Sequence, residues 1–459
     1  MTPLAPERKL FGTDGIRGVA GAFPLDEGTT FAIGSALGRH LSRRTGRKRV
    51  VIGKDTRESS DSIANSVAAG LAAEGVEIHS AGIITTPGIA HLTRCRKFDA
   101  GIVISASHNP WTDNGIKVFG PDGYKLPDQL ELEVEQEIFA GLAKPQAAPA
   151  MPAATPSLAA EAELRLDYVE HLVAAVDPVP TGLKLVVDCA NGAASSVAPE
   201  VFAHWSSELR GVEFINRDPN GQNINDHCGA LYPETVARAV VERKADLGIT
   251  FDGDADRALF ADAGGKVVNG DGVLLLAARD MKRAGRLRND LVVATTMSNM
   301  GLEAALKRSG IRMLRAAVGD KYVLEEMQKN GAALGGEQSG HIIFLDDATT
   351  GDGLLTALHV LQIVGRSGKP VAELVGDLKV FPQVIKNVRV REKKPLLEIA
   401  QIAGAIREAE QALDGSGRVV VRYSGTEALA RVMIEAESEL QMHRYADSIA
   451  AAIEKELGV

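Results

Sequence analysis

Three aspartates in the segment DGDADR are the residues of this sequence best suited to metal chemistry. Asp252, Asp254 and Asp256 alternate with glycine and alanine, and these small residues would let a tight loop bring three carboxylate oxygens to one cation. An EF-hand would need glycine at the sixth loop position and glutamate at the twelfth, and the sequence has neither. The segment therefore indicates Mg²⁺ with room for a phosphate, and a solvated acidic turn is the alternative.

A serine and a histidine stand side by side in SASHNP (105–110), directly after the apolar run AGIVI. In such a pair Ser107 could act as a nucleophile and His108 as a proton carrier. The alternative is a polar turn closed by Asn-Pro. These residues alone leave both interpretations open.

Two glycine-rich segments carry polar side chains that could bind a phosphorylated sugar. In FGTDGIRG, glycines allow the backbone to approach an anion and Arg17 could add a bidentate phosphate contact. In GGEQSGH, Glu337 and Ser339 could read vicinal hydroxyls or an amine, and His341 could relay a proton near neutral pH. Each segment taken by itself could equally be an ordinary polar loop.

The segment RYSGTEALAR, near the end of the chain, has the composition of a phosphate clamp. Its Ser-Gly-Thr turn offers hydroxyl and N–H groups that can surround an anion, and an arginine stands on either side. The alternative is a simple hairpin turn between two strands. The residues concerned are Arg422, Ser424, Gly425, Thr426 and Arg431.

The elements that would position these segments alternate between strand and helix, which predicts largely parallel sheets covered by helices. In the first region we expect a strand at 49–53, a helix at 60–75 and a strand at 100–104. The second region predicts strands at 183–188, 212–216 and 246–251, with helices at 195–205 and 234–244. The third predicts strands at 291–296 and 312–318, with helices at 271–285, 299–310 and 320–330.

The last eighty or so residues differ, because two expected strands there are separated only by a short loop and should be antiparallel. This part predicts strands at 387–392, 417–423 and 428–436, with helices at 397–413 and 443–457. The fold class is thus three consecutive α/β domains with mixed or parallel sheets, followed by a C-terminal α+β domain. The Ala/Pro-rich stretch 144–162 is the linker candidate, and the predicted domains are 1–155, 156–262, 263–376 and 377–459.

Composition narrows the class of protein further. The net charge of −9 argues against a nucleic-acid partner, which would need a basic face. The three cysteines are scattered without a CxxC pair, which indicates neither a disulfide framework nor a zinc site. Neither an apolar signal region at the N-terminus nor a run of about 18 apolar residues is present, so we expect a cytoplasmic protein without a membrane partner.

The four motifs SASHNP, DGDADR, GEQSGH and RYSGTE occur in this order, once per predicted domain. This set resembles the α-D-phosphohexomutase superfamily over essentially the whole chain, and the resemblance implies the heart-shaped four-domain architecture of that family. GIVISASHNPWTDNGIK, GGEQSGHII and TTGDG are similar to segments of the bacterial phosphoglucosamine mutases. Gln338 in GEQSGH is typical of that branch, whereas phosphoglucomutase/phosphomannomutase relatives usually carry methionine there.

The resemblance also implies roles for the residues of these motifs. Ser107 would carry a phosphate as phosphoserine, and its oxygen would complete the Mg²⁺ site of Asp252, Asp254 and Asp256. His341 or Lys117 would be the proton carrier, and the resemblance does not choose between them. The groups expected around the reacting phosphate are Arg17, His108, Lys117 and Arg257. The residues expected to hold the sugar and its other phosphate are Glu337, Ser339, Arg422, Ser424, Gly425, Thr426 and Arg431.

The implied reaction interconverts glucosamine 6-phosphate and glucosamine 1-phosphate through glucosamine 1,6-bisphosphate and feeds UDP-N-acetylglucosamine synthesis. Its partners would be small hexosamine phosphates, and the protein would be a monomer or a homodimer. The alternatives are a phosphoglucomutase/phosphomannomutase of the same superfamily, a Mg²⁺-dependent phosphatase and a non-catalytic sugar-phosphate sensor. A second phosphate site argues against the phosphatase, and the retained nucleophile and carboxylates argue against the sensor.

Three positions depart from the usual family pattern. Ala255 replaces the commoner glycine of the metal loop and is small enough to leave that site intact. Tyr423 and Ala428 stand where prolines are frequent, which predicts a more flexible phosphate loop in the last domain.

Overall fold

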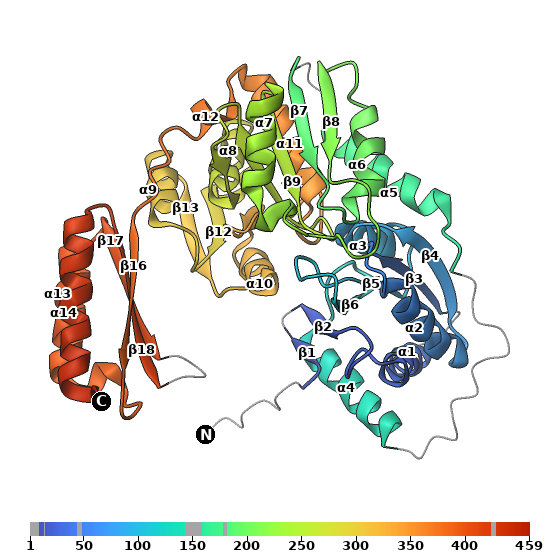
Figure 1. Ribbon diagram of the computed structural model, residues 1–459, viewed down its shortest axis with the longest axis horizontal. Helices are drawn as coiled ribbons and strands as arrows, with labels where there is room; N and C mark the ends of the chain where they lie inside the picture. The colour runs from blue at the N-terminus through green and yellow to red at the C-terminus, as the bar shows by residue number, and fades with distance from the viewer. Residues whose placement is uncertain (1–8, 13, 44–47, 144–157, 178–180, 424–427) are drawn as a thin grey trace. The chain divides into compact units, whose positions relative to one another are not determined.

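Four β-sheets with their helices organise the chain, as the ribbon of this computed structural model shows (Figure 1). The structure describes residues 9–12, 14–43, 48–143, 158–177, 181–423 and 428–459. These form two compact units. The first runs up to Thr296 and includes Leu314–Leu374, and the second consists of Met297–Met313 and Val375–Val459.

The first sheet has six strands in the order β1-β2-β6-β5-β3-β4 and is mixed. β3 runs parallel to β4 and β5, whereas β6 is antiparallel to both β5 and β2. The strands are β1 Phe11–Gly12, β2 Gly15–Val19, β3 Arg49–Lys54, β4 Glu77–Ile83, β5 Ala100–Ile104 and β6 Asp113–Phe119. The helices are α1 Glu27–Ser42, α2 Ser60–Ala73, α3 Thr86–Cys95 and α4 Asp128–Leu142.

Helices cover both faces of this sheet, which explains why its central strands are almost entirely apolar. Because side chains alternate along a strand, Val50 and Ile52 point into the core that α1, α2 and α4 share. On the other face α3 packs against β3 and β5. The parallel strands β3 and β5 end at the same edge, so the segment after β3 and the SASHNP loop after β5 meet there.

The second sheet has five strands in the order β11-β10-β9-β7-β8. β9 and β10 are antiparallel neighbours, and Phe251 at the end of β9 pairs with Ala258 at the start of β10. The DGDADR segment is therefore the short connection of this pair. The strands are β7 Lys184–Asp188, β8 Gly211–Ile215, β9 Leu247–Phe251, β10 Ala258–Asp262 and β11 Val267–Val268. The helices are α5 Ala162–Ala175, α6 Ala194–Ala203 and α7 Pro233–Arg243, with a 3₁₀ turn at Gly229–Leu231.

The third sheet has four strands in the order β13-β12-β14-β15. β14 and β15 are antiparallel, and the EQSGH residues connect them. The strands are β12 Leu291–Thr295, β13 Arg312–Ala316, β14 Leu334–Gly336 and β15 Ile342–Phe344. The helices are α8 Gly270–Arg283, α9 Met300–Arg308, α10 Asp320–Asn330, α11 Gly353–Ser367 and α12 Val371–Leu374, with a 3₁₀ turn at Arg288–Asp290.

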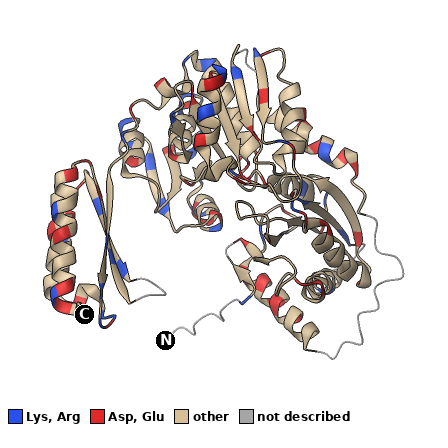
Figure 2. Cartoon of the chain, viewed as in Figure 1, with Lys and Arg blue, Asp and Glu red and all other residues tan. Residues whose placement is uncertain are grey.

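The C-terminal sheet is antiparallel, in the order β16-β18-β17, and lies in the second unit. Val432 and Ile434 point into its core with α13 and α14, so the alternating residues of β18 point to the other face. The helices carry many acidic residues, while Lys and Arg mark the strands (Figure 2). The elements are β16 Gln383–Arg389, β17 Gly417–Tyr423, β18 Leu429–Ala436, α13 Ala400–Ala412 and α14 Glu439–Leu457, with a 3₁₀ turn at Leu396–Glu398.

The structure confirms the predicted fold class and the antiparallel pairing of β17 with β18. The helix expected at 397–413 begins only at Ala400, because a 3₁₀ turn precedes it. The helix expected at 443–457 begins earlier, at Glu439, where the Ser438 hydroxyl accepts the Gln441 N–H and caps it. Of the expected linker, residues 144–157 lie outside the described residues, and the domain boundaries stay a prediction. None of the helices formed by the described residues is long and apolar enough to cross a membrane.

Candidate active site

Ser107 lies in the loop after β5, next to the aspartate loop of the second sheet. Its hydroxyl donates to Asp252 Oδ2 at 2.5 Å and lies 3.3 Å from His108 Nδ1. The side chain is buried, and its backbone has a φ of 52°, in the left-handed region that non-glycine residues seldom adopt. The predicted nucleophile and one predicted metal ligand are therefore in direct contact.

A glycine allows this contact between loops of the first and second sheets. A Cβ atom on Gly253 would lie 2.5 Å from the carbonyl oxygen of Ser107, which is too close for any other residue without a backbone shift. Gly253, one of the small residues that the sequence places between the aspartates, thus also lets the two loops meet.

The three aspartates form a buried group in which one oxygen of each lies within 4.8 Å of the others. Asp254 Oδ1 is buried and has no hydrogen-bond partner among the described residues. Burial, together with the charges of Asp256 and Asp254, raises the pKa of Asp252 well above its usual range. A divalent cation would remove this repulsion and give Asp254 Oδ1 a partner, so the site fits Mg²⁺.

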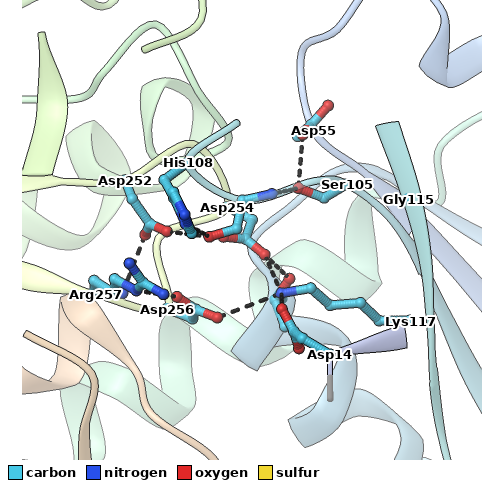
Figure 3. Close-up of polar contacts among 12 residues, drawn as sticks. Asp14, Asp55, Ser105, His108, Gly115, Lys117, Asp252, Asp254, Asp256 and Arg257 are labelled. Atoms are coloured by element: carbon cyan, nitrogen blue, oxygen red, sulfur yellow. Dashed lines mark hydrogen bonds and ion pairs between the residues drawn. The ribbon is translucent and has the colours of Figure 1, made fainter. Parts of the chain in front are cut away.

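Lys117 on β6 extends its ammonium group into this cluster of carboxylates (Figure 3). Its Nζ lies 2.8 Å from Asp254, 3.4 Å from Asp256 and 3.0 Å from Asp14. Burial favours the neutral amine, but the three carboxylates outweigh burial and hold the pKa of Lys117 well above its usual value. Lys117 is consequently a fixed positive charge in the site, suited to neutralise phosphate rather than to exchange a proton.

His341 lies between two carboxylates, with Nδ1 3.7 Å from Asp256 and Nε2 3.8 Å from Asp320. Although burial opposes the charge, these carboxylates raise its pKa. However, the Gly351 N–H donates to Nε2 at 3.0 Å, which requires that this nitrogen carry no proton. The direct hydrogen bond is the stronger observation, and it favours the neutral ring with its proton on Nδ1.

His108, next to the serine, is a second neutral imidazole. Burial, followed by the charges of Arg257 and Arg17, lowers its pKa to about 4. Arg17 donates to Asn109 Oδ1 at 3.4 Å and pairs with Asp14. The Arg257 backbone N–H donates to Asp252 Oδ1 at 3.1 Å. These residues, expected around the reacting phosphate, therefore do lie around Ser107.

The loop of residues 337–341, predicted to bind the sugar hydroxyls, is held in place by hydrogen bonds of its own side chains. Glu337 accepts the Gly319 N–H at 3.0 Å with one oxygen and the Ser339 hydroxyl at 3.1 Å with the other. The Gln338 amide donates to Asp271 on α8 at 3.4 Å. Gln338 thus helps to hold the loop against α8.

The predicted phosphate clamp is described only in part. Arg422 on β17 pairs with Arg431 on β18 across the sheet, on the face opposite α13 and α14. Two like charges opposite each other are unfavourable unless an anion lies near them. Ser424, Gly425 and Thr426 lie outside the described residues, as does most of the loop expected to be flexible. The Tyr423 hydroxyl donates to the Lys394 carbonyl at 2.6 Å.

Several residues of the site have no counterpart among the sequence predictions. Asp14 binds Lys117, Arg17 and Lys125, and these three cations hold its pKa well below the usual range although burial opposes this. The other residues missed are Asp55 and Arg57 after β3, Thr86 on α3, and Asn225. The charged run KDTR, directly after a buried strand of a parallel pair, was a signal for Asp55 and Arg57.

Sequence models of one family match most of the chain. The matches are to phosphoglucomutase/phosphomannomutase alpha/beta/alpha domain I over residues 8–144, domain II over 166–265, domain III over 269–381 and the C-terminal domain over 385–452. The order agrees with the four sheets.

Comparison with individual proteins points to the same family. The phosphoglucosamine mutase of Koribacter versatilis is 60% identical over 99% of this chain and 98% of its own length. That of Solibacter usitatus is 51% identical over 98% of this chain and 99% of its own. A phosphoglucomutase/phosphomannomutase family protein from Burkholderia thailandensis superimposes with a TM-score of 0.78 at 25% identity, covering 98% of this chain and 99% of its own.

Proposed function

The chain belongs to the phosphoglucomutase/phosphomannomutase family of α-D-phosphohexomutases, and on this premise we propose that it interconverts glucosamine 6-phosphate and glucosamine 1-phosphate. Relatives called phosphoglucosamine mutase match it over nearly their whole length. The observation that carries the mechanism is the contact of Ser107 Oγ with Asp252, beside the charged Lys117.

In the proposed reaction, phosphoserine at Ser107 gives its phosphoryl group to the free hydroxyl of the sugar phosphate. The bond between Ser107 Oγ and phosphorus breaks as the sugar oxygen bonds to phosphorus, and the proton of the sugar hydroxyl passes through the site to the departing Ser107 Oγ. The resulting glucosamine 1,6-bisphosphate reorients, its other phosphoryl group returns to Ser107 Oγ, and the Ser107 proton passes to the sugar oxygen that is released. The neutral ring of His108, whose Nδ1 lies 3.3 Å from Ser107 Oγ, can carry this proton. His341 and Lys117 are less suited, because the Gly351 N–H occupies Nε2 of His341 and the raised pKa of Lys117 holds its proton in place.

Charge explains why the site holds so many ionic groups. Phosphoserine brings close to two negative charges beside three carboxylates. Mg²⁺ held by Asp252, Asp254 and Asp256 would supply positive charge at the transferring phosphoryl oxygens. Lys117, Arg17 and Arg257 add fixed charge around the same point, which phosphoryl transfer needs more than covalent chemistry.

The proposal predicts the preferred sugar. We expect kcat/KM for glucosamine phosphate to exceed that for glucose phosphate by at least about tenfold, or about 1.4 kcal/mol of differential transition-state binding. Steady-state rates on glucosamine, glucose and mannose phosphates measure this. Equal or faster turnover of glucose or mannose phosphate would favour a phosphoglucomutase/phosphomannomutase, and release of inorganic phosphate without isomerisation would favour a phosphatase.

A second prediction concerns Arg422, which we propose to hold the phosphate that is not being transferred. Substrate and product both present such a phosphate, so Arg422→Ala should slow the two directions to a similar extent. A charged hydrogen bond of this kind contributes about 1.5–3 kcal/mol, or roughly ten- to a hundredfold in kcat/KM. Lys386→Ala is the matched control, because Lys386 pairs with Asp447 on the helix-covered face of the same sheet. A loss in one direction only would contradict this role.

A further inference from the structure

Arg57 uses every N–H of its guanidinium group, and the side chain has no exposed surface. Its Nε donates to Asp55 Oδ2 at 2.8 Å. Its other four N–H groups go to backbone carbonyl oxygens in or just after the SASHNP loop. These belong to Ser107 at 2.9 Å, Asn109 at 2.8 Å, Asp113 at 3.0 Å and Pro110. One buried cation therefore binds the loop of the nucleophile at four points.

Asp55 completes this arrangement from the other side. Its carboxylate accepts the Arg57 backbone N–H at 3.0 Å and the Ser105 hydroxyl at 2.7 Å, and Ser60 donates to it as well, at 3.0 Å. The Ser105 oxygen in turn accepts the N–H of Ser107 at 2.9 Å. Figure 3 shows Asp55 bound to Ser105, away from the metal carboxylates. The pair Asp55–Arg57 thus reaches both backbone polar groups of Ser107.

The backbone of Ser107 needs such support. Its φ of 52° is unfavourable for a residue with a Cβ atom and persists only where the surroundings fix it. The amide of Asn225, from the second sheet's side, also donates to the Ser107 carbonyl, at 2.9 Å. Two donors outside the loop, Arg57 and Asn225, and the Ser105 hydroxyl that Asp55 holds therefore determine where the Ser107 side chain points.

We propose that Arg57 is a positioning residue for phosphoryl transfer, which sets the direction of Ser107 Oγ by binding the carbonyl groups of its loop. This inference rests on the proposed function, because it assumes that Ser107 is the phosphorylated residue. Arg57 acts through the backbone and touches no sugar. Lysine cannot replace it, because an ammonium group has three donors on one nitrogen, whereas the planar fork of arginine offers five in fixed directions.

The test is Arg57→Lys, which keeps the charge beside Asp55 and removes the fork. A displacement of the reacting atom by about 1 Å can slow a reaction by about a hundredfold, so we expect kcat to fall by at least that factor. KM should stay within about threefold, because the groups that bind the sugar are unchanged. Arg49→Lys, at the opposite end of β3, where the arginine lies over the Phe98 ring, is the matched control and should keep kcat within about twofold.

A purely structural role gives a different result: Arg57→Lys would melt at a lower temperature but keep the wild-type kcat per folded molecule, and this would overturn the proposal. If Arg57→Lys does not fold, Asn225→Gly decides, since glycine tolerates the φ of 59° at this position. The Asn225 amide donates to the carbonyls of Ser107 and Asn109, at 2.9 Å and 3.2 Å, and Arg57 binds the same two carbonyls. We expect about a tenfold loss of kcat there, and an unchanged kcat would overturn the inference. The wild-type protein shows whether the inference about Arg57 or the proposed function has failed. Wild-type protein without phosphate on Ser107 would contradict the proposed function itself.

Discussion

Ser107→Ala should abolish the phosphorylated form of the protein and lower mutase turnover by at least about a thousandfold. The variant has no oxygen that can carry the phosphoryl group, so the covalent route disappears and only direct transfer is left. The hydroxyl it removes is the one that contacts Asp252. Wild-type protein should show an increase of about 80 Da on the peptide containing Ser107, and the variant should not. Peptide mass spectrometry and steady-state rates on glucosamine phosphate measure both effects.

Ser105→Ala is the matched control, two residues upstream in the same loop. The Ser105 hydroxyl is buried, donates to Asp55 and points away from the carboxylate cluster. The label should therefore stay on Ser107, with a loss of turnover below about tenfold, because the Ser107 N–H loses its acceptor. Phosphate found on Ser105, or wild-type turnover in Ser107→Ala, would rule out the mechanism.

The sequence predicts most of the fold because its signals are local. Buried strands such as Arg49–Lys54 and Ala100–Ile104 contain unbroken apolar runs, and helices such as Ser60–Ala73 carry apolar residues at helical spacing. The ends of elements are set by single side chains or short turns, so they are less predictable. Ser438 starts α14 four residues before the expected helix.

The candidate site, too, could be predicted from the sequence only in part. Ser107 and the three aspartates follow strands directly and stand in distinctive motifs, so their grouping could be expected. The contacts of Arg57 could not, because they depend on the loop geometry that places four carbonyl groups around one guanidinium. The same is true of Asp14, which meets Lys117 only because β2 and β6 pair through Ile16 and Ile116.

Loss of the metal ion, or of one carboxylate that binds it, should have the second large effect on turnover. Removing Mg²⁺ with a chelator should lower turnover by at least about a thousandfold, and Asp254→Asn should have a similar effect in the presence of Mg²⁺. Asp254 Oδ2 accepts the Thr86 hydroxyl at 2.5 Å and the Lys117 ammonium at 2.8 Å. These two donors will draw the amide oxygen of an asparagine to their side. The amide nitrogen, which cannot bind a cation, then replaces the buried Oδ1.

Thermal melting separates loss of the metal from loss of the fold. A cation that binds only the folded protein raises its stability, by about 2.7 kcal/mol at a hundred times the dissociation constant. We expect Mg²⁺ to raise the melting temperature of the wild-type protein, but not that of Asp254→Asn. The variant should still fold, because Lys117 keeps Asp14 and Asp256 as partners. Asp262→Asn is the matched control, since Asp262 only accepts the backbone N–H groups of a turn, and it should keep the response to Mg²⁺. A normal response in Asp254→Asn would mean that the cation binds elsewhere.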